Sequence, residues 1–187
     1  LLNLDTGISE EDCPLDLAPT TSTTASLALG DAIAVALLEA KNFKSDDFAK
    51  SHPGGKLGKR LITTVEDLMA KNKDLPVVSR DMTLSDTLIE ISSKGLGVAL
   101  VVEKKRLVGI FTDGDLRRTL NQVKDPLNKK IENYMTKRTK TILKNKLAIE
   151  ALDIMQKNKI YSIAVVDSKK IPVGIIRMHD LVEAGLV

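Results

Sequence analysis

This 187-residue chain has few aromatic residues, a single cysteine and no long hydrophobic run. Three Phe, two Tyr and no Trp leave the core to aliphatic side chains and give no aromatic platform for stacking nucleic-acid bases. Cys13 is the only cysteine, so an intrachain disulfide is impossible and a reducing, cytoplasmic location fits best. No apolar run approaches the ~18 residues that a transmembrane helix needs, and we therefore expect no membrane span.

Targeting and metal signals are missing as well. The first residues, Leu1–Leu4, include no initiator Met, no basic stretch and no signal-peptide profile. They read like the middle of a domain, and we expect the chain to be a fragment. Two His and one Cys, far apart in sequence, lack the spacing of a zinc site, so we expect neither a metal nor another cofactor.

The net charge of +3 is unevenly distributed. Residues 1–64 carry six Lys or Arg and nine Asp or Glu, whereas residues 65–187 carry 22 and 16, giving −3 and +6. A modest basic excess in the second part suits a small anionic ligand. It is too diffuse for a nucleic-acid groove.

Residues 1–64 contain one strong helix signal. The segment 25–40 is apolar on nearly every side, behind a run of hydroxyl residues at 20–24 that can cap a helix start. Such a helix needs cover on several sides, from a missing part of its domain or from a partner subunit. The loop 51–60 follows, with three glycines and one proline.

From Val65 onward one pattern occurs twice at an offset of 64 to 66 residues. Each copy predicts a helix followed by two short apolar strands and a short closing helix. The expected helices place Leu84, Leu88 and Ile91, and then Ala148, Leu152 and Met155, on one face. The expected strands are residues 98–102, 107–111, 162–166 and 172–176.

This pattern predicts a protein of the α/β (α+β) class. One copy alone is too small to close a core, so we expect two copies related by a pseudo-twofold axis to bury their sheets together. The cleft between the copies is then the natural ligand site.

Two pairs of residues at the ends of the second strands are the best ligand candidates. Thr112 and Asp115 stand between a strand and a helix, where a hydroxyl and a carboxylate three residues apart can hold a ribose diol. The same pair also fits a structural capping box. The second copy has Arg177 and Asp180 instead, and Arg favours a phosphate or carboxylate. We therefore predict two unequal half-sites.

The repeat, with Gly109-Ile110-Phe111-Thr112-Asp113-Gly114-Asp115-Leu116 at its first strand–helix junction, resembles a pair of cystathionine-β-synthase-type (CBS) domains. The resemblance covers residues 65–187, with the first domain at 65–125 and the second at 126–187. It implies a regulatory adenine nucleotide or related anionic metabolite as ligand, and association into homo-oligomers.

Residues 1–64 resemble the C-terminal piece of a sugar isomerase (SIS) domain, through the segments 17–24, 30–32 and 51–55. An SIS domain joined to a CBS pair is the arrangement of the bacterial D-arabinose 5-phosphate isomerase family, which acts on the phosphosugar D-ribulose 5-phosphate in the synthesis of Kdo for lipopolysaccharide or capsule. The resemblance implies an aldose–ketose isomerase with a CMP-Kdo-like ligand at the CBS pair, assembled as a tetramer.

The resemblance also implies two catalytic residues. His52, in the Ser-His-Pro-Gly-Gly motif, would assist sugar ring opening, since its side chain titrates near neutrality. Glu11, two residues before Cys13-Pro14, would be the base that moves a proton through an enediolate. Without the resemblance, we would interpret His52 as a structural histidine in a glycine-rich turn, and Glu11 as one of several acidic residues in a solvent-exposed loop.

The match to the isomerase family is incomplete. The Ser/Gly-rich phosphate loop, a lysine and a second glutamate of that family are absent from this sequence, so we expect the chain alone to be inactive. Two alternatives stay open. One is a free-standing CBS regulator or oligomerisation module, and the other is an SIS-containing transcription regulator, although no helix-turn-helix segment is visible.

Overall fold

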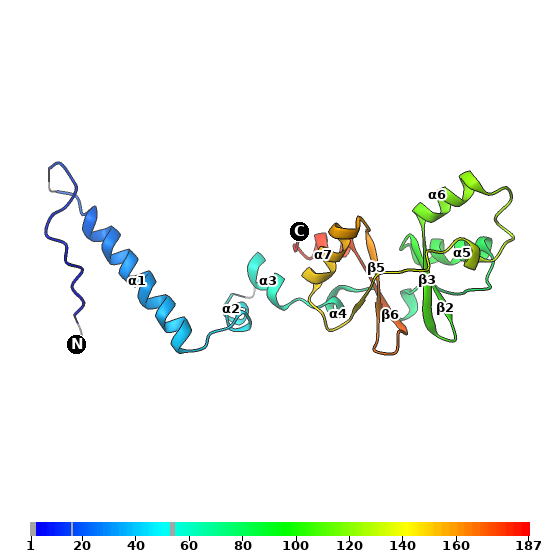
Figure 1. The fold of residues 1–187 in the computed structure, drawn as a ribbon, viewed down its shortest axis with the longest axis horizontal. Helices are drawn as coiled ribbons and strands as arrows, with labels where there is room; N and C mark the ends of the chain where they lie inside the picture. Colours follow the sequence, from blue (N-terminus) through cyan, green and yellow to red (C-terminus); the bar gives the residue numbers. More distant parts are fainter. Residues whose placement is uncertain (1–2, 16, 53–54) are drawn as a thin grey trace. The chain divides into compact units, whose positions relative to one another are not determined.

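The computed structural model of the chain describes residues 3–15, 17–52 and 55–187 (Figure 1). The chain divides into two compact units, Leu1–Ser51 and His52–Val187. Their division falls before the domain boundary expected at residues 64 and 65, because the helix that follows the glycine-rich loop belongs to the second unit.

The N-terminal unit contains α1 (Thr21–Ala40) and α2 (Ser45–Ser51). The expected helix is confirmed, and it begins one turn earlier than predicted. No residue of α1 is buried, and Leu27 is 69% exposed. An apolar helix left this open in its own unit lacks the packing partner that its composition requires.

One helix bears on the expectation of no membrane-spanning segment. By length and composition α1 could cross a bilayer, because its 20 residues include only two charged side chains, Asp31 and Glu39. The criterion of an uninterrupted apolar run overlooked it. A core helix of a soluble protein passes the same test, so α1 is weak evidence for a membrane protein.

The C-terminal unit begins with a short helix and continues as two similar modules. The first stretch contains α3 (Lys56–Ile62), α4 (Val65–Leu68), η1 (Asn72–Asp74), β1 (Val77–Ser79), α5 (Leu84–Lys94), β2 (Val98–Glu103), β3 (Arg106–Thr112) and α6 (Asp113–Gln122). The second contains η2 (Ile131–Asn133), β4 (Thr141–Leu143), α7 (Ala148–Asn158), β5 (Ser162–Val166), β6 (Pro172–Arg177) and α8 (Met178–Glu183).

Each module has a three-stranded sheet of the same topology. The orders are β1-β2-β3 and β4-β5-β6, with the first pair parallel and the second antiparallel in both. Both sheets shift register at matching places, Val101/Val102 and Val165/Val166. The predicted strands and the predicted repeat are therefore confirmed. The three-residue strands β1 and β4 were missed, since they are too short for an alternating pattern.

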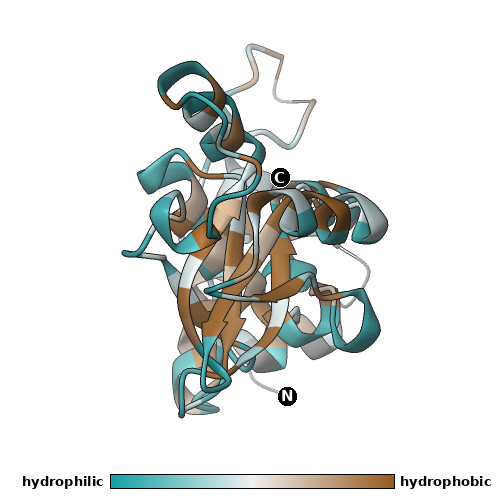
Figure 2. Ribbon diagram, turned by 90° about the vertical axis from the view of Figure 1, so that its right-hand side faces the viewer, coloured by the Kyte–Doolittle hydropathy of each residue, from teal (hydrophilic) through white to brown (hydrophobic). Residues whose placement is uncertain are grey.

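The predicted helices α5 and α7 are confirmed with their buried faces. Leu84 and Ile91 on α5, and Ala148 and Met155 on α7, are each at most 6% exposed. Helix α5 ends at Lys94 and is capped by Gly95, whose φ of 66° is the left-handed conformation that favours glycine at this position. Figure 2 shows that the strands are mostly hydrophobic, whereas the helices contain both hydrophobic and hydrophilic residues.

The two repeats exchange their first segments. Val65 and Met69 lie in the core of the β4–β6 module, and Ile131 lies in the core of the β1–β3 module. Backbone bonds join the exchanged segments to their hosts: Ala148 donates to Thr63 O at 2.8 Å, and Leu84 donates to Lys129 O at 2.9 Å. Each repeat therefore completes the core of the other.

A third apolar cluster joins the two sheets. It is formed by Val98, Leu100, Ile110, Ala164 and Ile175, all at most 7% exposed. The residues come from β2 and β3 of one module and from β5 and β6 of the other. Shared burial of the sheets, as the repeat predicted, fixes the modules side by side and positions the ends of β3 and β6 at one cleft.

Candidate functional site: a basic cleft between the two modules

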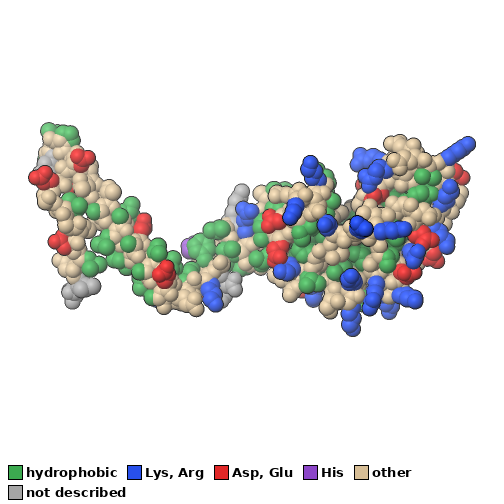
Figure 3. Space-filling view, viewed as in Figure 1, with side chains coloured by type: hydrophobic (Ala, Val, Ile, Leu, Met, Phe, Trp, Pro, Cys, Tyr) green, Lys and Arg blue, Asp and Glu red, His purple; other side chains and the backbone are tan. Residues whose placement is uncertain are grey.

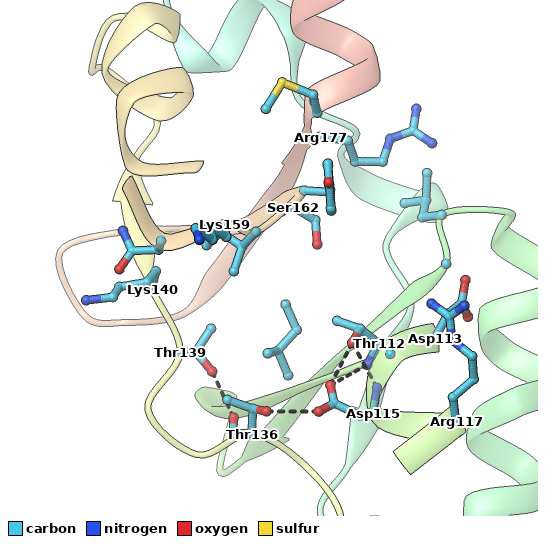
Figure 4. A pocket seen from close by; sticks show the side chains of 18 of the residues that line it. Thr112, Asp113, Asp115, Arg117, Thr136, Thr139, Lys140, Lys159, Ser162 and Arg177 are labelled. Atoms are coloured by element: carbon cyan, nitrogen blue, oxygen red, sulfur yellow. Dashed lines mark hydrogen bonds between the residues drawn. The ribbon is translucent and has the colours of Figure 1, made fainter. Parts of the chain in front are cut away.

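A cleft of about 850 Å³ opens where the ends of β3 and β6 meet (Figure 4). Figure 4 shows Arg177, Ser162 and Lys159 across the cleft from Thr112 and Asp115. This volume falls within the range of small-molecule sites. The predicted cleft between the copies is present.

Cations outnumber carboxylates in the wall of the cleft. The basic lining residues are Arg117, Arg118, Arg138, Lys140, Lys159 and Arg177, and the acidic ones are Asp113 and Asp115. Low-dielectric walls concentrate the field of these charges in the hollow. The cleft therefore favours an anionic ligand.

Thr112 and Asp115 form the capping box that the sequence analysis gave as the structural alternative for this pair. Thr112 Oγ1 accepts from Asp115 N at 3.3 Å, while Asp115 Oδ2 accepts from Thr112 N at 3.0 Å and from Thr112 Oγ1 at 2.7 Å. These bonds start α6 at the mouth of the cleft. Both residues line the cleft, so the capping role and a ligand-binding role coincide in space.

The other oxygen of Asp115 is also occupied. Asp115 Oδ1 accepts from Thr136 Oγ1 at 3.1 Å and pairs with the Arg118 guanidinium. Asp115 is only 6% exposed, whereas the Arg118 side chain is 65% exposed. A ribose hydroxyl that approaches Asp115 must therefore take the place of Arg118 or Thr136.

Arg177 and Asp180 form the unequal counterpart. Asp180 accepts from Arg177 N at 2.8 Å, and its other oxygen pairs with Arg177 Nη2 at 2.6 Å. The hydrogen bond to Asp180 raises the pKa of Arg177, while partial burial opposes this shift. Arg177 lines the cleft, but Asp180 is not among the lining residues. The carboxylate therefore orients the guanidinium from behind.

Several cleft residues were not identified from the sequence. Thr136, Arg138 and Lys140 lie in the connection that enters the second module, and Tyr161 and Ser162 lie where β5 begins. A signal for the first three existed: they follow residues 131–135, which repeat residues 65–69. Only the fold places that connection at the cleft.

Glu11 lies at the start of α1. Its Oε2 accepts from Thr20 N and Thr21 N, both at 2.7 Å, and from Ser22 N at 3.2 Å. A side-chain hydrogen bond with Ser22 is the main cause that lowers the pKa of Glu11; desolvation opposes it, and the backbone bonds from Ser22, Thr20 and Thr21 lower the pKa further. Thr20 makes no side-chain cap bond, so the expectation that a hydroxyl residue caps this helix was wrong. Glu11 supplies the cap because its carboxylate favours a helix N-terminus.

His52 is exposed and opens the C-terminal unit. Pro53 and Gly54 of the Ser-His-Pro-Gly-Gly motif lie outside the described residues. Glu11 and His52 belong to different units, and a shared catalytic site stays a prediction.

Comparison with known proteins agrees with the repeat. The sequence profile of the CBS domain matches residues 65–122 and 131–186. Curated proteins named arabinose 5-phosphate isomerase KdsD match the chain as well. The one from Pseudomonas aeruginosa is 50% identical over 187 residues, and the one from Francisella tularensis is 48% identical over 185. These matches cover 100% and 99% of this chain and 57% of each relative, so the chain spans little more than half of their length.

Solved structures share the fold of the C-terminal part. The CBS domain pair of protein MJ0100, in complex with 5′-methylthioadenosine and S-adenosyl-L-methionine, is 25% identical with a TM-score of 0.58, covering 65% of this chain and 94% of that one. The CBS domain protein NE2398 gives a TM-score of 0.61 at 20% identity, covering 67% and 98%.

Proposed function

The chain belongs to the CBS domain family, and we propose that its paired modules are the regulatory part of an arabinose 5-phosphate isomerase. The observation that carries the proposal is the 50% identity to a curated arabinose 5-phosphate isomerase, which extends through residues 1–64 as well as the CBS modules. A free-standing CBS regulator would have no need for that N-terminal segment.

In the full-length protein, the reaction would interconvert D-ribulose 5-phosphate and D-arabinose 5-phosphate. The step moves a proton between adjacent carbons through an enediolate, with Glu11 as the base and His52 as the group that assists ring opening. A lowered pKa keeps Glu11 ionised at neutral pH but makes it a weaker base. This weakens Glu11 as the base and leaves the separate role proposed for His52 unchanged. Residues 1–64 would be the end of the SIS domain.

The cleft would bind a regulatory nucleotide or sugar nucleotide such as CMP-Kdo. Thr112 and Asp115 would hold the ribose, and Arg177 would hold the anionic group from the facing module. The basic lining and the nucleosides bound by the MJ0100 pair support this ligand class. We place the assembled protein in the cytoplasm as a homo-oligomer, a tetramer by analogy with the family.

The isomerase assignment is tested in the full-length protein with D-arabinose 5-phosphate as substrate. We expect His52→Ala to lower kcat by about 100-fold, which is the scale of a general acid–base group. His179→Ala is the matched control, since this second histidine is exposed and lies 3.6 Å from the carboxylate of Glu183. Full activity of His52→Ala would remove the catalytic role of His52. No isomerase activity in the unaltered full-length protein would refute the proposed function.

The cleft ligand is tested with the present chain by isothermal titration calorimetry against CMP-Kdo, CMP, AMP and ATP. Binding that weakens on Thr112→Val and on Arg177→Ala would support the sensor role. If none of the four binds, the pair acts as a dimerisation scaffold.

A further inference from the structure

We propose that a second, smaller pocket of the C-terminal unit binds a phosphate group, independently of the isomerase reaction. Its volume is about 190 Å³, and it lies at the edge where the β2–β3 and β5–β6 hairpins approach the connection into the second module. The lining residues are Leu107, Val108, Lys137, Arg138, Thr139, Thr141, Val166 and Lys170.

The charges of this pocket are of one sign. Lys137, Arg138 and Lys170 line it, and no carboxylate does. Within the part of the chain that the structure describes, no ion pair joins any of these three cations to a carboxylate, whereas Arg80, Arg118, Lys144 and Arg177 are all ion-paired. Three like charges around one hollow repel one another, and an anion among them removes that repulsion. On the face drawn in Figure 3, Lys and Arg side chains are spread over much of this unit.

The acidic group that interacts with Lys137 is already paired with an arginine. Glu132 lies within electrostatic reach of Lys137, but its Oε2 accepts from Arg80 Nε at 2.9 Å and pairs with the Arg80 terminal nitrogen as well. Lys137 is therefore left with its charge available to a ligand.

The pocket has a fixed frame. Leu107 N donates to Lys170 O at 3.0 Å and joins the two hairpins. Asp167 Oδ1 accepts from Lys169 N at 2.9 Å and from Ile171 N at 2.8 Å, which holds the turn that carries Lys170. On the opposite side, Thr139 Oγ1 donates to Thr136 O at 3.1 Å. Bonds of this kind reduce the conformational freedom lost on binding.

Size and chemistry select the ligand class. The pocket holds roughly six waters at ~30 Å³ each, enough for a hydrated phosphate group but too small for a nucleoside. Two lysines, one arginine and the hydroxyl of Thr141 are donors suited to phosphate oxygens. The source is either free phosphate or the phosphate of a small ester.

Arg138 and Thr139 also line the large cleft. An anion in the small pocket therefore competes with a cleft ligand for the Arg138 guanidinium. Occupation of the small pocket should lower the affinity of the cleft for an anionic ligand.

The test is an NMR titration of the ¹⁵N-labelled chain with inorganic phosphate, at ionic strength held constant with sodium chloride. We expect the amide signals of residues 137–141 and 107 to shift and saturate. The Lys137→Gln/Lys170→Gln double variant should bind about tenfold more weakly, as the loss of two charge contacts implies. The matched control, Lys104→Gln/Lys105→Gln, removes two charges from the neighbouring hairpin turn and should change the affinity less than twofold.

Two further titrations separate the sources of the phosphate. Saturation by inorganic phosphate and by ribose 5-phosphate, with the Gly97 and Tyr161 signals of the cleft unmoved, identifies a separate phosphate site. Saturation by the ester alone identifies the phosphate of a small ester as the ligand. Shifts that fail to saturate with either probe, or a control variant that loses as much affinity as the test variant, would overturn the proposal. None of these outcomes depends on nucleotide binding or isomerase activity.

Discussion

Met135 fills the space in which a side chain on Gly109 would stand. A Cβ atom placed on Gly109 would lie 2.5 Å from Met135 Sδ and 2.9 Å from its Cγ. Met69 contacts Gly174 in the same way in the other half, with Cγ 3.0 Å from the Cβ position. Met69 lies in the first segment of the first repeat and packs on a strand of the second repeat, while Met135 does the reverse. The two contacts therefore hold the modules together.

We therefore expect Gly109→Ala to destabilise the C-terminal unit by about 1–3 kcal/mol, the usual cost of an extra carbon in a packed site. The midpoint of urea unfolding measures this. Gly30→Ala is the control, because nothing lies within 4 Å of its Cβ position and Ala favours a helix. The second change Met135→Ala should restore part of the loss in Gly109→Ala, since it removes the clashing atoms. An unchanged midpoint in Gly109→Ala would show that the contact is loose.

The exchange of segments between the two modules was not predicted from the sequence, whereas most of the secondary structure was. The repeat, the four longer strands and the faces of α5 and α7 follow from local periodicity, so they were predicted correctly. The exchange of residues 65–69 and 131–135 between cores depends on contacts far apart in sequence. The local periodicity of a sequence does not indicate such long-range contacts.

The candidate site was also predicted only in part from the sequence. Thr112 and Asp115 lie at the cleft because a strand–helix junction places them there, and that junction is visible in the sequence. The roles of Thr136 and Lys140 required the packing of the second module on the first. The Glu11 cap joins residues about ten apart in sequence through an irregular loop, for which no periodic signal exists.

Arg177→Thr restores the first-copy motif in the second copy and should shift ligand preference. We expect affinity for a doubly charged nucleotide to fall about tenfold, since the guanidinium is lost, while affinity for an uncharged nucleoside stays within a factor of two. Calorimetry at two salt concentrations measures both ligands. Arg117→Thr, another cation of the cleft wall, is the matched control and should have a smaller effect. Equal losses in the two variants would mean that only the total charge matters.

Asp67 gives the exchanged α4 segment a predicted pH dependence. The hydrogen bond from Thr64 Oγ1, and then that from Thr64 N at 2.8 Å, lower the pKa of Asp67 below its usual 3.8. A carboxyl whose pKa is lower in the folded state stabilises that state above the unfolded pKa, and this stabilisation is lost as the pH falls through the folded pKa.

The expected difference between the wild-type chain and Asp67→Asn is therefore present at pH 6, smaller at pH 3 and absent below the folded pKa of Asp67. Its size should be about 1 kcal/mol or less, because the group is largely solvated. Urea unfolding at the two pH values measures it. Asp153→Asn removes an exposed carboxylate from α7 and serves as the control. A difference that persists undiminished at pH 3 would assign the effect to packing instead of charge.

Glu11 presents two separable roles, and one pair of variants distinguishes them. As a cap, it accepts three backbone N–H groups of α1, and its lowered pKa means that the cap holds above pH ~4.5 and weakens as the pH falls below that value. Glu11→Ala should therefore reduce the far-UV circular dichroism of α1 at pH 7, whereas Glu10→Ala, which removes the adjacent exposed carboxylate, should not.

In the full-length protein, Glu11→Gln separates the cap from the chemistry. Its amide oxygen still accepts from the helix N–H groups but is no base, so a catalytic Glu11 predicts normal helicity with kcat lowered at least 100-fold. A capping role alone predicts that both helicity and kcat stay close to the wild-type values. Because the hydrogen bonds from the Ser22 side chain and from the helix N–H groups weaken the basicity of the carboxylate, a retained kcat would assign the proton transfer to another group. Glu11 would then be only the residue that fixes the start of α1.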